Sequence, residues 1–428
     1  MRALVRIFGL IALAMLLSAN GNAQTPDPYE PIEDVVKLYK AGDFYALDKL
    51  ATKLRIEKNR TPSGRWYLGW FYANLDAAIL EGNNTETQWS AVESKLNRWI
   101  ADCPQSATAP IALATAQESH AWALRGNGFA STVTSEGWEG FAKHMAISRN
   151  TLETNKRISS DDPQWYVVML RVALAQGWKQ EKYWALYEEA LLKEPLYYGT
   201  YFQAAERLIP MWGGSMEEIR DFAKNAVKRT ASTEGKGMYA RIYWAMSHRI
   251  APAQFLAGSG ESATWADMRA GFRDVIKSYP SDFNKNAFAQ YACRFGDVDT
   301  FLAVFNSFQG RLDDVIWTGN TFQECKEWAA KLRPNRLLTS TGERDLAGIA
   351  AVSEPAPSPS SGRCNAAPAQ FTLGRNANAA LEDEARTRAG AKTVRVLKPG
   401  QIVTMEFNAE RLSLTVDDAG RVTRVSCG

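Results

Sequence analysis

The stretch VVKLYKAGDFYALDKLATKL, Val35 to Leu54, decides the class of fold for most of this chain. Apolar residues recur with helical spacing from Val35 to Tyr39 and again from Leu47 to Leu54. Gly42-Asp43 interrupts the pattern, and a glycine at this point is typical of a helix end. The stretch therefore predicts two helices joined by a tight turn.

The same pattern of two helices and a break recurs along the chain. One predicted pair runs from about Pro163 to Lys193, and a second from about Tyr197 to Thr230 with Gly213-Gly214 between its helices. In SYPSDFNKNAFAQYACRFGD, Ser278 to Asp297, a proline stops one helix and a Gly-Asp pair ends the next. Each hairpin alone would expose an apolar face, so neighbours are expected to stack. We therefore predict a curved all-α array of antiparallel helices in a domain covering residues 24–333.

This region resembles tetratricopeptide-like helical repeats and, more narrowly, a bacterial helical family of unknown function. The likeness rests on LYKAGDFYALDKL, Leu38 to Leu50, and on YYGTYFQAAERLIPMWGGSMEEIRDFA, Tyr197 to Ala223. It implies a scaffold that binds a protein or peptide, and it implies no activity. All fourteen tryptophans precede the last hundred residues. We expect most of them to anchor helix packing, with Trp66 and Trp70 as candidates for a concave binding face.

The first 23 residues have the three-part pattern of a secretory signal peptide. Arg2 and Arg6 form a basic start, Ile7 to Leu17 is almost wholly apolar, and Ala23 suits a cleavage site. An uncleaved anchor is the alternative, although the apolar run is short for a membrane span. We predict a periplasmic or secreted protein without stable membrane insertion. Cleavage would leave 48 basic and 47 acidic residues, which gives no electrostatic reason to expect nucleic acid as a partner.

Export makes disulfides the expected state of the five cysteines. Cys364 and Cys427 bracket the last stretch of the chain, and we predict that they pair. Cys293 and Cys325, in one helical region, are the candidates for a second pair. Cys103 is then left as a small buried hydrophobic residue. With no CxxC pair and only three histidines, the sequence predicts no metal site built from Cys and His.

The helical region contains no recognisable catalytic motif. HExxH, GxSxG and a glycine-rich phosphate loop followed by lysine are all missing from the sequence. His120 follows Glu118 by two positions, and side chains at that spacing do not face each other on a helix. Asp161-Asp162 precedes Pro163 and is typical of a helix start. We therefore predict no enzyme activity and no cofactor.

The last hundred residues change character. Residues 334–363 include the Pro- and Ser-rich segment SEPAPSPSSGR and are predicted to be a linker. Beyond it, one helix is expected to lie on a small sheet whose first two strands are parallel, because the connection between them is long. The predicted elements are a helix at Asn378–Ala389 and strands at Thr393–Leu397, Arg411–Asp417 and Arg421–Val425.

Within this region, AGAKTVRVLKPGQIVTMEF, the strand start RL and the closing SCG carry a specific resemblance. They are similar to the potato inhibitor I family of serine protease inhibitors, and most of all to its small microbial elastase-inhibitor relatives. The resemblance covers residues 364–428 and implies a small α+β inhibitor domain. It implies that the segment Gly400–Arg411 is a substrate-like loop for a chymotrypsin-, elastase- or subtilisin-like protease. The loop residues facing the protease would be Ile402, Val403, Thr404, Met405, Glu406 and Phe407.

By the same resemblance, Met405-Glu406 is the reactive bond, and Met405 enters the primary pocket of the protease. Arg411 would support the loop through charge-assisted hydrogen bonds to Glu406 and Thr404. The chain departs from the plant and leech members at Ser413, where they have a second supporting arginine. The alternative function is a cell-envelope interaction scaffold whose C-terminal domain keeps the fold without inhibition.

Overall fold

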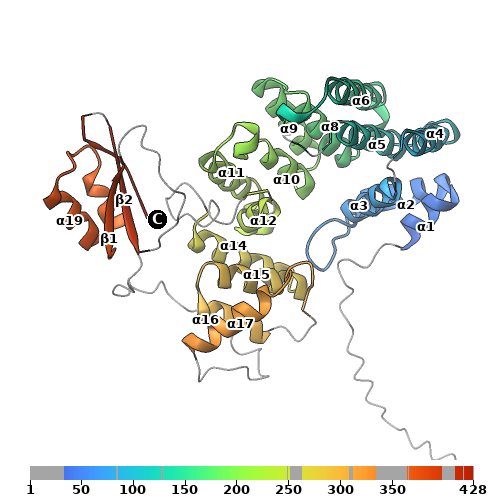
Figure 1. Cartoon of the computed structure of the whole chain (residues 1–428). Helices are drawn as coiled ribbons and strands as arrows, with labels where there is room; N and C mark the ends of the chain where they lie inside the picture. Colours follow the sequence, from blue (N-terminus) through green and yellow to red (C-terminus); the bar gives the residue numbers. More distant parts are fainter. Residues whose placement is uncertain are drawn as a thin grey trace, which may run out of the picture.

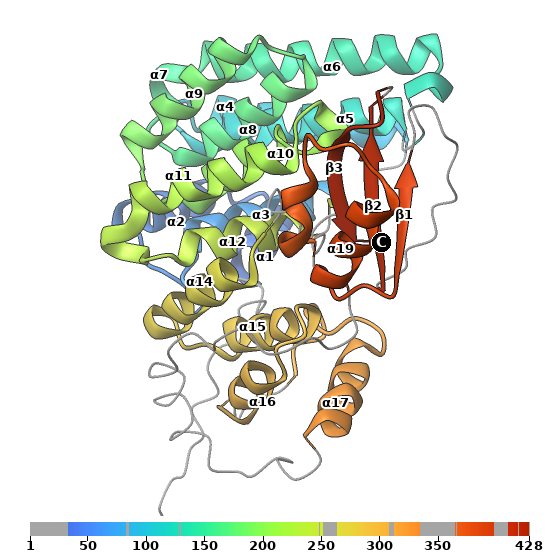
Figure 2. The ribbon, with the colours of Figure 1, turned by 90° about the vertical axis from the view of Figure 1, so that its left-hand side faces the viewer.

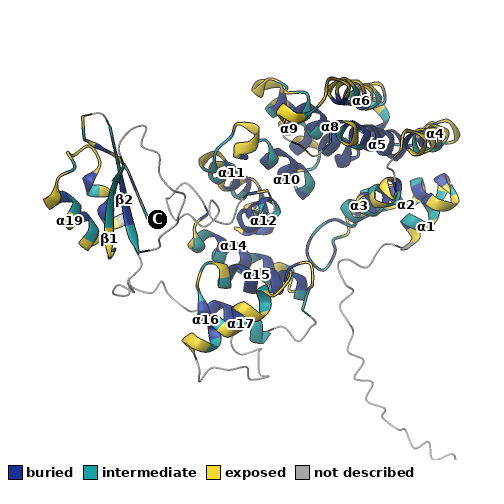
Figure 3. Cartoon of the chain, in the orientation of Figure 1, coloured by how far each residue is buried: buried dark blue, intermediate teal, exposed yellow. Residues whose placement is uncertain are grey.

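The computed structural model describes residues 33–82, 85–126, 128, 130–247, 249–250, 263–307, 312–333, 364, 366–397, 410–417 and 419–427. These residues form a helical part and a small α+β domain, each with its own hydrophobic core (Figure 1). In the helical part, the buried sides of the helices face neighbouring helices (Figure 3). The predicted signal peptide (1–23) and linker (334–363) lie outside the described residues, so both remain predictions.

The helical part begins with α1 (Glu33–Ala41), and its last described helix is α17 (Thr321–Leu332). Between them lie α2 (Phe44–Glu57), α3 (Tyr67–Leu80), α4 (Glu86–Asp102), α5 (Thr108–Arg125), η1 (Ala130–Thr132), α6 (Ser135–Thr154), α7 (Lys156–Ser159), α8 (Pro163–Ala175), α9 (Gln180–Lys193), α10 (Tyr198–Glu206), η2 (Pro210–Trp212), α11 (Met216–Glu234), α12 (Gly237–Met246), α14 (Trp265–Ser278), α15 (Asp282–Arg294) and α16 (Val298–Ser307).

The first predicted hairpin is confirmed. The helices α1 and α2 meet at Gly42, whose φ of +75° lies in the left-handed region that glycine enters without steric cost. Asp43 caps α2, because its carboxylate accepts a hydrogen bond from the Ala46 backbone N–H at 3.1 Å. Gly42 therefore ends α1, and Asp43 starts α2.

The other predicted helix pairs also form. The pair α8–α9 spans Pro163 to Lys193, and Asp162 caps α8 as expected. The pair α10–α11 contains Gly213 between its helices, and α11 continues to Glu234, four residues beyond the predicted end. Proline and glycine therefore marked the breaks correctly, and the true end of α11 is also marked by a glycine, Gly235, whose φ is +53°.

A contact between distant parts of the chain closes the array. Arg241 of α12 and Asn284 of α15 both donate hydrogen bonds to the Ser63 carbonyl, at 2.7 and 3.2 Å. Arg60 Nη2 also lies 3.6 Å from Glu234 Oε1. The segment between α2 and α3 thus reaches helices more than 170 residues further along the chain (Figure 1). Repeats of a solenoid contact only their neighbours, so the structure does not confirm a tetratricopeptide-like array.

Asp76 on α3 is a partly buried acid in the helical part. Its Oδ1 atom is buried without a hydrogen-bond partner. Burial raises the pKa of Asp76 from 3.8 to about 7, although the guanidinium of Arg171 opposes the shift. The native state therefore holds this proton more tightly than the unfolded chain does. The resulting stability is complete below pH 4 and is lost as the pH rises through 7.

Asp76→Asn is expected to raise the thermal midpoint of the helical part at pH 8 and to leave it nearly unchanged at pH 4. The gain at pH 8 has an upper limit of about 4 kcal/mol, because the substitution removes a carboxylate that is costly to ionise. Tryptophan fluorescence during heating at the two pH values measures the effect. The matched control is Asp314→Asn, at an exposed position. Equal changes in both variants would show that Asp76 is not the group responsible.

The C-terminal domain combines two helices with a three-stranded sheet. The helices are η3 (Ala367–Thr372) and α19 (Ala379–Arg388). The strands are β1 (Thr393–Leu397), β2 (Arg411–Val416) and β3 (Val422–Cys427), in the order β1-β2-β3. The first pair is parallel and the second antiparallel, and α19 packs against β1, as predicted (Figure 2).

Apolar and polar residues alternate along β2, but burial does not follow this alternation. Leu412, Leu414 and Val416 lie in the core of the domain. Ser413, on the opposite face of the strand, is also buried, at 2% exposure. Because β2 is the central strand, the strands on either side of it help to cover a short side chain there.

Both predicted disulfides are present. Cys364 bonds to Cys427, and Cys293 of α15 bonds to Cys325 of α17, each with a Cα–Cα distance of 5.8 Å. Cys103 is a free cysteine that is only partly buried at the end of α4. The disulfides indicate an oxidising extracellular or periplasmic environment. Among the described helices, none combines the length and apolar character needed to cross a bilayer.

Candidate functional site

The structure describes the two strand ends between which the predicted protease-binding segment lies. Residues 398–409 lie outside the described residues, and with them the predicted contact residues from Ile402 to Phe407. The connection leaves β1 at Leu397 and enters β2 at Arg411. In the parallel register Leu397 lies beside Thr415, four positions along β2 from Arg411. At about 3.3 Å per residue, the connection must therefore cover about 13 Å from one end of the sheet to the other.

Backbone hydrogen bonds hold the point where the connection enters the sheet. The N–H groups of Lys392 and Thr393 donate to the Glu410 carbonyl at 2.7 and 3.2 Å. Lys392 Nζ also lies 2.7 Å from Glu410 Oε1, but both side chains are largely exposed, so this ion pair contributes less than about 1 kcal/mol. Arg411 follows as the first residue of β2. Its predicted partners, Thr404 and Glu406, lie outside the described residues, so its supporting role remains a prediction.

The domain that carries this connection has a compact hydrophobic core and a disulfide. The core joins Leu381 and Ala385 of α19 to buried residues of β2 and β3. Asn378 caps α19, because its side chain accepts a hydrogen bond from the Leu381 N–H at 2.9 Å. A domain this small buries little apolar surface, so the Cys364–Cys427 bond supplies a large share of its stability.

Replacing Cys364 and Cys427 together by serine is expected to destabilise the C-terminal domain by about 4 kcal/mol, because the disulfide no longer restricts the unfolded chain. Hydrogen exchange of the β2 and β3 amides, followed by mass spectrometry, measures this directly. The control is Cys103→Ser, which removes a thiol but no crosslink. Unchanged protection of β2 and β3 in the double variant would contradict the prediction.

A second candidate site is a pocket of about 960 Å³ in the helical part. Three tryptophans contribute to its wall: Trp122 of α5, Trp138 of α6 and Trp212 of η2. The rings of Trp122 and Trp212 are 6.4 Å apart, and Phe141 lies between Trp122 and Trp138. Trp138 and Trp212 are 39% and 38% exposed, so their rings are open to a ligand. Such a wall suits an apolar or aromatic group.

Four of the five charged groups that line the pocket form two ion pairs. Glu118 Oε2 lies 2.7 Å from Arg171 Nε, and Arg249 Nε lies 3.5 Å from Glu206 Oε1. Burial raises the pKa of the Glu118 carboxyl, and Arg171 opposes the rise. Arg125 lies over the rings of Trp122 and Trp138, 5.6 and 5.3 Å from their centres. The pocket therefore combines an apolar surface with two Arg–Glu pairs and one further arginine, Arg125.

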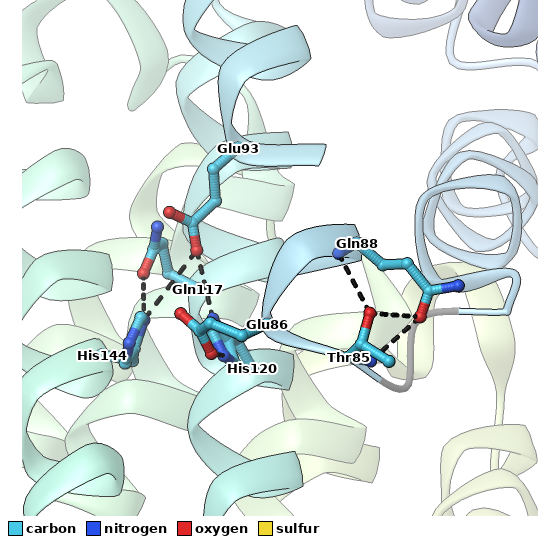
Figure 4. A network of polar contacts seen from close by, with 7 residues as sticks. All are labelled: Thr85, Glu86, Gln88, Glu93, Gln117, His120 and His144. Carbon is cyan, nitrogen blue, oxygen red and sulfur yellow. Dashed lines mark hydrogen bonds and ion pairs between the residues drawn. The ribbon is translucent and has the colours of Figure 1, made fainter. Parts of the chain in front are cut away.

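A third group of residues is able to hold a metal ion. Glu93 of α4, His120 of α5 and His144 of α6 place one ligand atom each within 4.8 Å of one another. Figure 4 shows that the three side chains converge, with Gln117 and Glu86 beside them. The sequence predicted no metal site, and none of these residues is close to another of the three in the sequence.

The structure changes the interpretation of several other side chains. Trp66 is 5% exposed and packs edge-on against Tyr197 at 5.5 Å, so it is a packing anchor and does not form an open binding face. The open aromatic wall comes from Trp138 and Trp212, which the sequence did not distinguish from the other tryptophans. Glu118 pairs with Arg171 and not with His120, in agreement with their spacing in the sequence.

The C-terminal α+β domain is closed by a disulfide and has a long connection between its two parallel strands. Such a domain is suited to presenting a binding segment. The Peptidase inhibitor I78 family matches residues 364–428, the whole of this domain. The Domain of unknown function (DUF4034) family matches residues 31–176. No curated protein and no solved structure matches the chain.

These matches support the two resemblances at a coarser level. The C-terminal domain is similar to a family of peptidase inhibitors, while its assignment to the potato inhibitor I type remains a prediction. The N-terminal match ends at residue 176, so the second quoted segment, Tyr197–Ala223, lies beyond it. A protease is thus the kind of partner that the C-terminal match implies.

Proposed function

We propose that this protein is an exported serine protease inhibitor carried on a helical scaffold. The observation that carries the proposal is the match of residues 364–428 to a peptidase inhibitor family, over the same residues that the Cys364–Cys427 disulfide encloses. The segment Gly400–Arg411 presents Met405-Glu406 to a chymotrypsin-, elastase- or subtilisin-like enzyme. Methionine is apolar and unbranched, which suits the hydrophobic primary pockets of such enzymes.

Inhibition follows from a segment that is held extended before it meets the enzyme. Residues Ile402 to Thr404 add a strand to the protease, in the manner of β-augmentation. Ordering costs little, because β1 and β2 already fix both ends of the connection. Arg411, at the start of β2, donates charge-assisted hydrogen bonds that keep the segment in place after the protease attacks the reactive bond.

The scaffold binds a protein or peptide through its aromatic pocket. Two half-exposed tryptophans and a volume of about 960 Å³ fit one or two apolar side chains. Such a contact would bring the inhibitor domain close to a chosen protease. The competing function is an interaction scaffold of the cell envelope, in which the same pocket acts and the C-terminal domain no longer inhibits.

The test is inhibition of chymotrypsin, pancreatic elastase and subtilisin by the oxidised chain 24–428. Stoichiometric inhibition of at least one enzyme, blocked when its active-site serine is already modified, is the expected result. A thiol assay showing one free cysteine per chain confirms that both disulfides have formed. No inhibition of any of the three by such a sample would overturn the proposal and favour the interaction scaffold.

A further inference from the structure

Three consecutive long helices bring an unusual set of side chains together. The helix α5 packs against both α4 and α6. Glu86 and Glu93 are seven residues apart on α4, which places them on one face of that helix. Gln117 and His120 are three residues apart on α5, and His144 projects from α6. All five side chains meet where the three helices touch (Figure 4).

The distances within this group are close to those of a coordination site. His120 Nδ1 lies 3.2 Å and His144 Nδ1 lies 3.9 Å from the same atom, Glu93 Oε1, and all three ligand atoms lie within 4.8 Å of one another. A zinc ion bonded at about 2.0–2.2 Å to nitrogen and oxygen ligands in a tetrahedron separates those ligands by roughly 3.3–3.6 Å. Small side-chain movements, of about 1 Å, therefore bring the three ligand atoms to the separations that one ion needs.

A second carboxylate already fixes the orientation of His120. Its other ring nitrogen, Nε2, lies 3.1 Å from Glu86 Oε2. Histidines that ligate metals generally donate their remaining N–H to a carboxylate or carbonyl, which sets the tautomer. Trp89 stacks on the His120 ring, with ring centres 4.7 Å apart and planes within 7°. The ring is thus held so that Nδ1 faces Glu93 and His144.

The second imidazole lies buried beside the first. His144 is 6% exposed, and its ring centre lies 4.0 Å from that of His120. Gln117 Oε1 lies 2.7 Å from His144 Nδ1 and accepts a hydrogen bond from it, so binding of an ion at Nδ1 moves the ring proton to Nε2. Glu93 is partly exposed and Glu86 largely exposed, and they give an ion a route from solvent.

We propose that Glu93, His120 and His144 bind one divalent transition-metal ion, with zinc as the best match to two imidazoles and a carboxylate. Glu86 positions His120 without touching the ion. Bound there, the ion ties α4, α5 and α6 to one another in the middle of the first half of the helical part. The site is independent of the C-terminal domain and of its inhibition of proteases.

Zinc binding to the full, untagged chain tests the proposal. The protein is stripped with a chelator, the chelator is removed, and zinc is titrated in competition with a coloured zinc indicator. We expect one ion per chain and a higher thermal midpoint with zinc. His120→Gln and His144→Gln are expected to weaken binding by more than about 100-fold, and Glu86→Gln by about 10–100-fold. His248→Gln, which removes the remaining histidine, serves as the matched control and is expected to bind as the parent chain does.

Cobalt supplies a second readout that does not depend on the indicator. In a site with nitrogen and oxygen ligands it gives a visible absorption band, which is expected to be lost in His144→Gln. Should the histidine variants fail to fold, Glu86→Gln keeps all three ligands and still predicts weaker binding. The proposal is overturned if the stripped chain binds no ion saturably, or if the two histidine variants and Glu86→Gln all bind zinc as tightly as His248→Gln does.

Discussion

Met405→Asp is expected to weaken inhibition of the target protease by at least about a thousandfold. The proposed function places the Met405 side chain inside a hydrophobic pocket of the enzyme. An aspartate there loses its hydration without gaining a partner, which costs at least about 4 kcal/mol. Since 1.4 kcal/mol corresponds to a factor of ten in affinity, the loss is about three orders of magnitude. Titration of a chymotrypsin-like enzyme against the oxidised chain measures it.

Three further substitutions distinguish the contact made by Met405 from the support given by Arg411. Met405→Leu keeps an apolar side chain of similar volume and is expected to retain inhibition. Met405→Lys is expected to move inhibition toward a trypsin-like enzyme, whose pocket selects positive charge. Arg411→Ala should instead yield an inhibitor that is hydrolysed at Met405-Glu406, because the segment loses its support. Full inhibition by Met405→Asp would place the primary contact at another residue.

Asp162→Ala is expected to lower the stability of the helical part by about 4 kcal/mol. The Asp162 side chain is fully buried, and its Oδ2 accepts from Arg55 Nε at 2.9 Å and from the Tyr72 hydroxyl at 2.7 Å. Its Oδ1 also accepts from the Gln164 N–H at 3.0 Å and so caps α8. One carboxylate thus joins α2, α3 and α8. Removing it leaves the Arg55 charge without its partner in a largely buried position. Removing one member of a buried ion pair costs more than replacing both members by apolar residues.

Urea unfolding followed by tryptophan fluorescence measures this loss, because all fourteen tryptophans lie in the helical part. The adjacent residue supplies the control. Asp161 is 77% exposed at its side chain and pairs with Lys193 at 2.6 Å on the surface. Asp161→Ala is therefore expected to cost less than about 1 kcal/mol. Similar losses in the two variants would show that the buried pair is not the source of the effect.

Local sequence signals were sufficient to predict the strands, the strand pairing and the helix start of the C-terminal domain. The predicted bounds of β1 and β2 are correct to within one residue, strict alternation having marked β2, and the length of their connection gave the parallel pairing. Asn378 marked the start of α19, as a capping residue should. In a small domain these local signals nearly determine the fold, since few other arrangements bury the same residues.

For the helical part, the sequence predicted the individual helices but not the contacts between helices that are distant in the sequence. Its closure depends on Ser63, whose carbonyl binds two side chains from helices far along the chain, and no local pattern announces such a contact. The cluster of Glu93, His120 and His144 comes from three helices, so its members are more than twenty residues apart in the sequence. Trp138 and Trp212 differ from the other tryptophans only in exposure, which the packing of neighbouring helices decides.

The position of the Cys364–Cys427 disulfide changes the outcome of proteolysis. Met405-Glu406 lies between the two bridged cysteines, so hydrolysis of that bond opens a closed ring and releases no fragment. If a protease cleaves this bond as proposed, the new chain ends stay covalently linked through the disulfide, while β1 and β2 remain paired. The bond can then be remade from a product whose two halves have not separated. Cleaved and intact protein would differ by one water in mass and would separate into two pieces only after reduction.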